Sequence, residues 1–198
     1  MIRLHTERLE VRELPPLAGA KVARFVRENW SFHQQWAPER KNDYFTRGAH
    51  VSILRAERRS ENVVHFWLLK HPDGRTRGNW RQAEIVGSAS LSCIVRGAFQ
   101  SCFLGYMIGF RFARQGYMTE ALREIVSYGF DELKLHRIEA NIIPRNAASL
   151  GLVRGLGFRE EGIARRYLRI AGTWEDHIHM TMLAEEWAAE RRTGVRAD

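Results

Sequence analysis

The residue pattern best suited to chemistry lies at positions 111–121, where a predicted strand leads through a basic loop into a predicted helix. Gly116 stands at the helix start, and a glycine lets a bulky group approach the backbone because it has no Cβ. Unpaired amides at a helix start bind anions, with help from the helix dipole, and Arg111 and Arg114 add positive charge here. The pattern indicates a phosphate site, although an ordinary helix start beside a solvated basic loop would look the same.

A second helix start follows the next predicted strand, in the run PRNAAS at 144–149. Asn146 is a good N-cap because its side-chain oxygen can accept a backbone hydrogen bond, and capping alone would account for it. Ser149 lies one turn along the same helix face and has no such structural role. Two helix starts after two consecutive strands suggest a cleft at the carboxyl ends of those strands, where α/β sheets commonly bind ligands.

Hydrophobic periodicity and turn residues predict the elements that would position these residues. Strands are predicted at 9–14, 65–69, 83–95, 102–108, 137–143, 158–170 and 177–183, and helices at 17–30, 44–59, 117–133 and 146–155. Loops are predicted at 36–43 and at the arginine-rich stretch 75–81. This order predicts a mixed α/β fold with a central sheet of about six to seven strands flanked by about four helices, antiparallel in its first half and with at least one parallel crossover.

Length and charge limit the classes of protein to consider. The chain has 198 residues, which fits a single domain at 1–187 followed by a polar C-terminal tail at 188–198 that frays. Its formal net charge of +8 attracts polyanions such as nucleic acid, acidic protein surfaces or a phosphorylated cofactor, although a solvated basic surface fits equally well. The charged N-terminus is unlike a signal peptide, and no apolar run could span a bilayer, so we expect a cytoplasmic protein without membrane association.

Cysteine and histidine residues show no pattern of a metal site. Cys93 and Cys102 are the only cysteines, and their spacing favours buried thiols over a disulfide or a zinc site. No cysteine-nucleophile signature surrounds either one, and the eight histidines lack the HExxH spacing of a zinc hydrolase. We therefore expect no metal.

Several runs together resemble the GNAT superfamily of acetyltransferases. The runs LGYMI (104–108) and RQGYMTEAL (114–122) resemble the strand and the pyrophosphate loop of this family. The runs HRIEA (136–140), PRNAAS (144–149) and GLGFREEG (155–162) resemble the next strand, helix and strand of the family. The ribosomal-protein alanine N-acetyltransferase branch is the most similar, through TERL (6–9), YLRI (167–170), AGTWEDH (171–177) and EW (186–187). One departure lies in the loop, where Ala113 and Arg114 replace the family's usual Gln or Arg and its glycine.

The resemblance implies the GNAT fold and acetyl-CoA as cosubstrate. Acetyl-CoA would lie between the strands that end near residues 108 and 143, with its pantetheine arm along the backbone of Met107 and Ile108. Its pyrophosphate would lie on the amides of residues 114–119, with Arg111 or Arg114 compensating for the departure. The cofactor-binding residues expected are Met107, Ile108, Arg111, Arg114, Gln115, Gly116, Tyr117, Met118, Thr119, Asn146 and Ser149.

The same resemblance implies direct attack of an amine on the thioester, without a covalent acetyl-enzyme. Ser149 is then the candidate for meeting the CoA sulfur, and Tyr167 is a second candidate proton donor, although a hairpin tyrosine is more often a packing residue. The general base stays open. Glu139, Asp176 beside His177, or a chain of water molecules could serve.

Three functions remain to be weighed. The first is acetylation of the N-terminal amine of a ribosomal or other basic protein. The second is acetylation of a small amine, such as a polyamine, an amino acid or an antibiotic. The third is a basic ribosome- or RNA-binding module without catalysis, which the absence of an RNA-recognition motif disfavours, so we do not expect direct nucleic-acid binding. A monomer or a homodimer would suit any of them.

Overall fold

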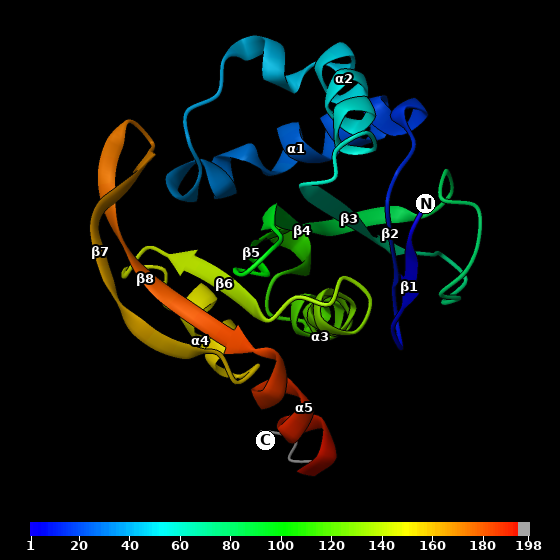
Figure 1. Ribbon diagram of the computed structural model, residues 1–198. Helices are drawn as coiled ribbons and strands as arrows, with labels where there is room; N and C mark the ends of the chain where they lie inside the picture. The colour runs from blue at the N-terminus through cyan, green and yellow to red at the C-terminus, as the bar shows by residue number, and fades with distance from the viewer. Residues whose placement is uncertain (194–198) are drawn as a thin grey trace.

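The computed structural model describes residues 1–193, and one continuous mixed sheet forms its centre (Figure 1). The eight strands lie in the order β1-β2-β3-β4-β5-β6-β8-β7. Every neighbouring pair is antiparallel except β5 and β6, which are parallel. The strands are β1 (Arg3–His5), β2 (Glu10–Arg12), β3 (Val63–Lys70), β4 (Glu84–Val95), β5 (Ser101–Ile108), β6 (Arg137–Ile142), β7 (Arg159–Ile170) and β8 (Thr173–Leu183).

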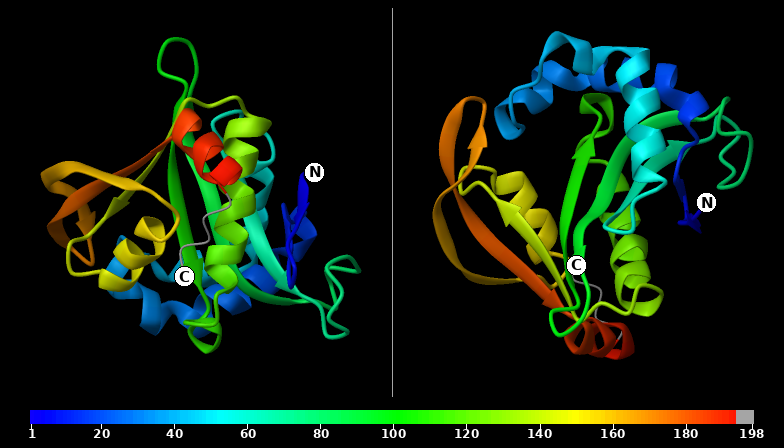
Figure 2. Two further views of the ribbon diagram at one scale, coloured as in Figure 1. Left: turned by 90° about the horizontal axis from the view of Figure 1, so that it is seen from below. Right: turned by 45° about the horizontal axis from the view of Figure 1, so that its top comes forward.

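Helices cover both faces of the sheet (Figure 2). Successive residues of a strand point to opposite faces, so β3 shows which helices lie on which side. Phe66 and Leu68 pack in the same core cluster as residues of α3 and α4, whereas Trp67 and Leu69 pack with residues of α1 and α2. The helices are α1 (Gly19–His33), α2 (Arg47–Glu57), α3 (Tyr117–Asp131), α4 (Ala147–Arg154) and α5 (Ala184–Thr193). None of them, within residues 1–193, has the length and apolar character needed to cross a membrane.

Helix α3 is held against the sheet by one apolar face. Its fully buried residues recur at the three- and four-residue spacing of an amphipathic helix, at Ala121, Leu122, Ile125 and Val126. The packing of this face places the N-terminus of α3 just beyond the carboxyl end of β5.

The parallel pair β5 and β6 separates after only three residues. The pairing covers Ser101–Phe103 and Arg137–Glu139, although β5 continues to Ile108. On its other side β6 pairs with β8 along its whole length, from Arg137 to Ile142. The two strands therefore form a V that opens toward their carboxyl ends, as the resemblance implies.

Two differences from the sequence prediction enlarge the fold. The strand β1 was not predicted, because three residues are too short to show an alternating pattern, and it brings the sheet to eight strands. The predicted polar tail instead begins inside α5, where the Trp187 Nε1 atom donates a hydrogen bond to Ser127 Oγ of α3 at 3.2 Å. Residues 188–193 are thus helical, and 194–198 lie outside the described residues.

Two local predictions were also wrong. The helix predicted from residue 44 begins instead at Arg47, after a 3-10 turn at Asn42–Phe45, because Thr46 caps it by accepting a hydrogen bond from the amide of Ala49. Cys93 is exposed rather than buried, since it lies in the irregular stretch between Ser92 and Val95, where the pairing of β4 with β5 shifts register. Cys102 is buried as expected, and both thiols are free.

Candidate active site

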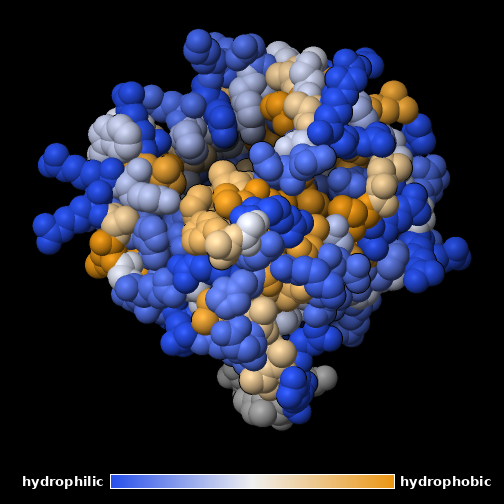
Figure 3. All heavy atoms as spheres, in the orientation of Figure 1, coloured by the Kyte–Doolittle hydropathy of each residue, from blue (hydrophilic) through white to orange (hydrophobic). Residues whose placement is uncertain are grey.

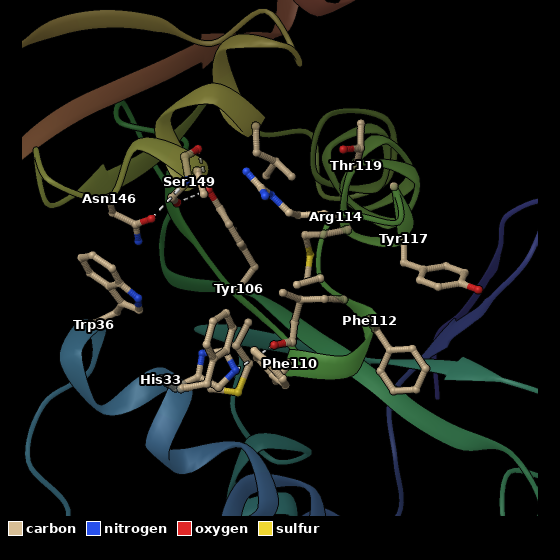
Figure 4. Close-up of a pocket in the computed structure, with 18 of the residues that line it drawn as sticks. His33, Trp36, Tyr106, Phe110, Phe112, Arg114, Tyr117, Thr119, Asn146 and Ser149 are labelled. Carbon is tan, nitrogen blue, oxygen red and sulfur yellow. Dashed lines mark hydrogen bonds between the residues drawn. The ribbon is translucent and has the colours of Figure 1, made fainter.

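A cavity of about 610 Å³ occupies the opening between β5 and β6 (Figure 4). It is bordered by the end of α1, the carboxyl end of β5, the start of α3 and the start of α4. In the space-filling view, hydrophobic side chains gather near the centre of the face that looks at the viewer (Figure 3). The lining residues include Arg114 and no carboxylate. The cavity therefore favours an elongated, partly apolar and anionic occupant.

The loop before α3 offers an anion site at one end of the cavity. The amides of residues 114–119 donate no hydrogen bond to the rest of residues 1–193. Gly116 has the left-handed conformation with φ of 80° and forms the N-cap of α3. Arg114 is also left-handed, with φ of 61°, at the position where the GNAT family usually has glycine. These two conformations turn successive amides toward the cavity, which is the geometry a pyrophosphate needs.

The N-terminal segment fixes this loop from behind. Arg8 donates from Nη1 to the carbonyl of Gln115 at 3.1 Å and lies over the ring of Tyr117 at 4.3 Å. Its Nε also pairs with the carboxylate of Glu120 at 2.6 Å. Burial alone would raise the pKa of Glu120, but hydrogen bonds from Thr6 and Arg8 together lower it. The TERL run thus serves as an anchor for the first turn of α3.

The same cavity is lined by a pair of hydroxyl groups. Ser149 Oγ lies 2.6 Å from the Tyr106 hydroxyl, and the amide of Ser149 donates to Asn146 Oδ1 at 3.2 Å, which confirms Asn146 as the cap of α4. Burial raises the pKa of Tyr106 to about 12, despite the opposing effect of its hydrogen bond with Ser149. The Tyr106 hydroxyl therefore stays protonated near neutral pH, and the hydroxyl pair can donate a proton to an anion formed beside it.

The end of α1 forms the opposite wall. His33 Nε2 donates to the carbonyl of Ile108 at 2.8 Å, and Asn29 Oδ1 accepts from the amide of Phe110 at 2.8 Å. Burial lowers the pKa of His33. Trp36 lines the cavity and is covered by the guanidinium of Arg145 at 4.9 Å. These contacts hold α1 against the end of β5.

Nine of the twelve predicted site residues line this cavity, and three do not. The nine are Met107, Ile108, Arg114, Gly116, Tyr117, Met118, Thr119, Asn146 and Ser149. Arg111 points instead toward Glu84, at 3.4 Å, and Gln115 donates to the carbonyl of Arg111 at 2.7 Å. Tyr167 lies on β7 outside the cavity lining, with its ring 5.0 Å from the ring of His179. Their predicted roles remain predictions.

The candidates for general base have different surroundings. Asp176 accepts a hydrogen bond from the amide of Arg166 at 2.8 Å and so fixes an irregular turn of β7. His177 is buried, its Nδ1 lies 3.1 Å from the carbonyl oxygen of Glu175, and burial lowers its pKa. Glu139 is buried on β6, where it contacts Arg137 at 2.7 Å.

Ten further residues line the cavity without being in the predicted set, and the side chains of three of them make contacts described above. Tyr106 was predicted as part of the strand at 102–108, and Trp36 as part of the loop at 36–43. His33 gave no signal, because its partner Ile108 lies 75 residues further along the chain. The one sequence signal for these residues was the tyrosine within the LGYMI run, a polar side chain in a strand that borders the predicted cleft.

Comparisons with known proteins agree with this geometry. Residues 3–159 match the model of the acetyltransferase (GNAT) domain, so the chain belongs to the GNAT family and is an N-acetyltransferase. Enzymes of this family use acetyl-CoA, and the free amides and the hydroxyl pair fit that cosubstrate.

Three relatives are informative. The [Ribosomal protein uS5]-alanine N-acetyltransferase of Escherichia coli (strain K12) is 34% identical over 193 residues, covering 96% of this chain and 95% of that protein. Probable N-acetyltransferase YjcK of Bacillus subtilis (strain 168) is 40% identical over 159 residues, covering 79% and 83%. The solved structure of Mycobacterium smegmatis RimJ in complex with CoA-disulfide has a TM-score of 0.81 and 27% identity, covering 98% of this chain and 93% of that one.

Proposed function

We propose that this enzyme transfers the acetyl group of acetyl-CoA to the N-terminal amine of a protein, with a ribosomal protein as the expected acceptor. The observation that carries the proposal is one cavity that combines an anion site with a pair of proton donors. The free amides of residues 114–119 form the anion site, and the Ser149–Tyr106 hydroxyl pair supplies the proton donors. The similarity to the uS5-alanine enzyme over 96% of the chain supports the choice of acceptor.

Each part of the cavity has a task in this reaction. The loop amides and Arg114 would bind the pyrophosphate. The edge of β5 beyond Phe103 is free of β6, so the backbone of Met107 and Ile108 can pair with the extended pantetheine arm. Ser149, hydrogen-bonded to Tyr106, would donate a proton to the departing thiolate.

The acceptor would approach between α1 and the β7–β8 hairpin. The segment after α1 contacts the turn of this hairpin where the amide of Ala171 donates to the carbonyl of Ala37 at 3.0 Å. Arg145, in the loop between β6 and α4, pairs with Glu175 of β8 at 2.6 Å. Trp36 lies beside this contact. A protein N-terminus whose first residue has a small side chain could reach the thioester between α1 and the β7–β8 hairpin.

Binding and transfer can be tested in two steps. Calorimetric titration should give micromolar binding of acetyl-CoA and of CoA, and no binding of ATP. Mass spectrometry should then detect acetylation of a synthetic peptide with a free N-terminal alanine, with the same peptide blocked at its N-terminus as control. Transfer to spermidine but not to the peptide would move the acceptor to the small-amine class, and absence of CoA binding would overturn the proposal.

A further inference from the structure

Three polar side chains of β6 and β8 form a cluster that the reaction described above does not use. We call Glu139, Asn141 and His179 the β6–β8 cluster. Asn141 pairs directly with His179 across the two strands. Ile138, Ala140 and Ile142 of β6 pack into the core on the α3 side, so the intervening Glu139 and Asn141 face the opposite side of the sheet.

Two atoms of this cluster are buried without a hydrogen-bond partner. His179 Nδ1 lies 3.0 Å from Glu139 Oε1, so Nδ1 keeps its proton and points it at the carboxylate. Nε2 of the neutral ring is then an acceptor. His179 Nε2 and Asn141 Oδ1 have no partner among the described residues. Leaving buried polar atoms unpaired costs free energy, and two adjacent acceptors of this kind call for a ligand that donates two hydrogen bonds. A primary amine is such a donor.

The cluster lies at the point where β5 and β6 separate, on the side of the sheet opposite the hydroxyl pair. Glu139 pairs with Phe103 at the last residue pair before β5 and β6 separate. The next residue of β5 on that face is Gly105, which is exposed and leaves the face open. Tyr106 points to the other face, toward Ser149. The cluster and the hydroxyl pair thus lie on opposite sides of the sheet, so an amine at the cluster would approach the thioester from the side away from the Ser149 hydroxyl.

We propose that His179 and Asn141 bind the incoming amine and that His179, oriented by Glu139, removes its proton. The inference rests on the proposed function. The ammonium gives one proton to His179 Nε2, and its nitrogen lone pair then forms a bond to the thioester carbonyl carbon. The carbon–sulfur bond breaks with its electron pair on sulfur, which takes a proton from the Ser149 hydroxyl. The second proton leaves nitrogen for solvent, and solvent restores the hydroxyl.

The other charged and titratable groups around the cluster are compatible with this role. Arg137 of β6 holds the second Glu139 oxygen at 2.7 Å. Tyr167 of β7 lies against His179 and His177. Burial, together with the charge of Glu139, raises the pKa of Tyr167, so its hydroxyl stays neutral in the working range of a histidine base.

The decisive variant is His179→Gln, with His65→Gln as its matched control. His65 of β3 also pairs through Nδ1 with a glutamate, Glu57 at 2.7 Å, and its side chain is 21% exposed against 24% for His179. With acetyl-CoA and the N-terminal alanine peptide, His179→Gln should lower kcat/KM about 100-fold at pH 7 and remove the acid limb of the pH profile. Acetyl-CoA binding should be unchanged, and His65→Gln should behave as the wild type.

A second variant, Glu139→Gln, tests the orienting carboxylate. It should move the acid limb of the kcat/KM profile to lower pH, because the protonated imidazole loses its anionic partner. A wild-type profile in either folded variant would overturn the inference while the proposed function stands. Failure of the wild-type enzyme to acetylate any amine would overturn both.

Discussion

The hydroxyl of Ser149 is held in place by contacts with its own neighbours in the fold. Tyr106 fixes its oxygen at 2.6 Å, and the Asn146 side chain fixes its amide at 3.2 Å. A donor that is already oriented loses little further freedom on reaching the transition state, so such groups contribute more to rate than to binding.

We therefore expect Ser149→Ala to lower kcat about 100-fold, because the thiolate loses its proton donor. The Kd for acetyl-CoA should stay nearly unchanged. Tyr106→Phe should lower kcat less, since Ser149 would remain. Tyr128→Phe is the control, because Tyr128 packs against Phe66 away from the cavity. Steady-state kinetics with calorimetric binding would check this, and an unchanged rate for Ser149→Ala would remove the residue from the mechanism.

Residues whose role depends on near neighbours in the chain were predictable. Asn146 and Ser149 are three positions apart, and capping geometry relates them directly. Tyr106 meets Ser149 across 43 residues, and that contact depends on the packing of α4 against the sheet. His179 lies within an alternating strand, where no pattern separates it from a surface histidine.

At the scale of elements, the start of α3 is the anion site, and Gly116 is its most restrictive position. Gly116→Glu should abolish acetyl-CoA binding, because a Cβ there meets Arg8 Nη2 at 3.2 Å, which disturbs the loop, and the added negative charge lies beside the pyrophosphate site. Gly97→Glu is a close control. Gly97 has φ of 71°, near the 80° of Gly116, and a Cβ there meets no atom within 4 Å. Both variants carry the same backbone strain, so equal binding by both in calorimetry would refute the loop assignment.

The first strands are fixed by a buried ionic group. Glu10 contacts Arg12 at 2.9 Å and His71 at 2.8 Å, and all three are at most 4% exposed. Glu10→Ala should lower the free energy of unfolding by about 3 to 5 kcal/mol, because it leaves buried polar groups without a partner. Asp73→Ala removes the exposed pair with Arg75 and should cost less than about 1 kcal/mol. Urea unfolding would compare them, and equal losses would contradict the argument.

Elements with a strong period were predicted almost to their ends, and elements defined by tertiary contacts were not. Helix α3 was found because its apolar residues recur every three or four positions. The β7 strand was found too, but its register shift between Ala164 and Leu168 was not, and that shift sets where the Tyr167 side chain points. Helix α5 looked like a tail because Trp187 is its one large apolar residue.

For the whole molecule, the decisive feature is that the parallel strands β5 and β6 separate before their carboxyl ends. The order of strands and helices predicted a parallel crossover, but not that it would stop at Phe103. The other edge of β6 is paired with β8, a strand about forty residues later in the chain, so the position of β6 depends on a distant contact. The cavity is thus a property of the complete sheet, although the residues that line it come from local motifs.

Cys102 has a buried thiol in the middle of this sheet. This thiol makes the free energy of unfolding of the whole fold decrease as the pH becomes alkaline. Burial raises the pKa of Cys102 from 9.0 to about 12. The unfolded chain therefore loses the thiol proton first as the pH rises above 9, and the folded state becomes relatively less stable. Raising the pH from 8 to 10 should lower the free energy of unfolding by about 1.4 kcal/mol through this group.

Comparison with Cys102→Ala isolates the effect, because the cost of the lost side chain is the same at both pH values. Tyr106, whose pKa is also raised to about 12, acts equally in both proteins and cancels. The exposed Cys93 supplies the control, and Cys93→Ala should keep the wild-type pH dependence. Urea unfolding at pH 8 and pH 10 measures the difference. Equal losses in the wild type and in Cys102→Ala would mean that the thiol ionises within the folded sheet.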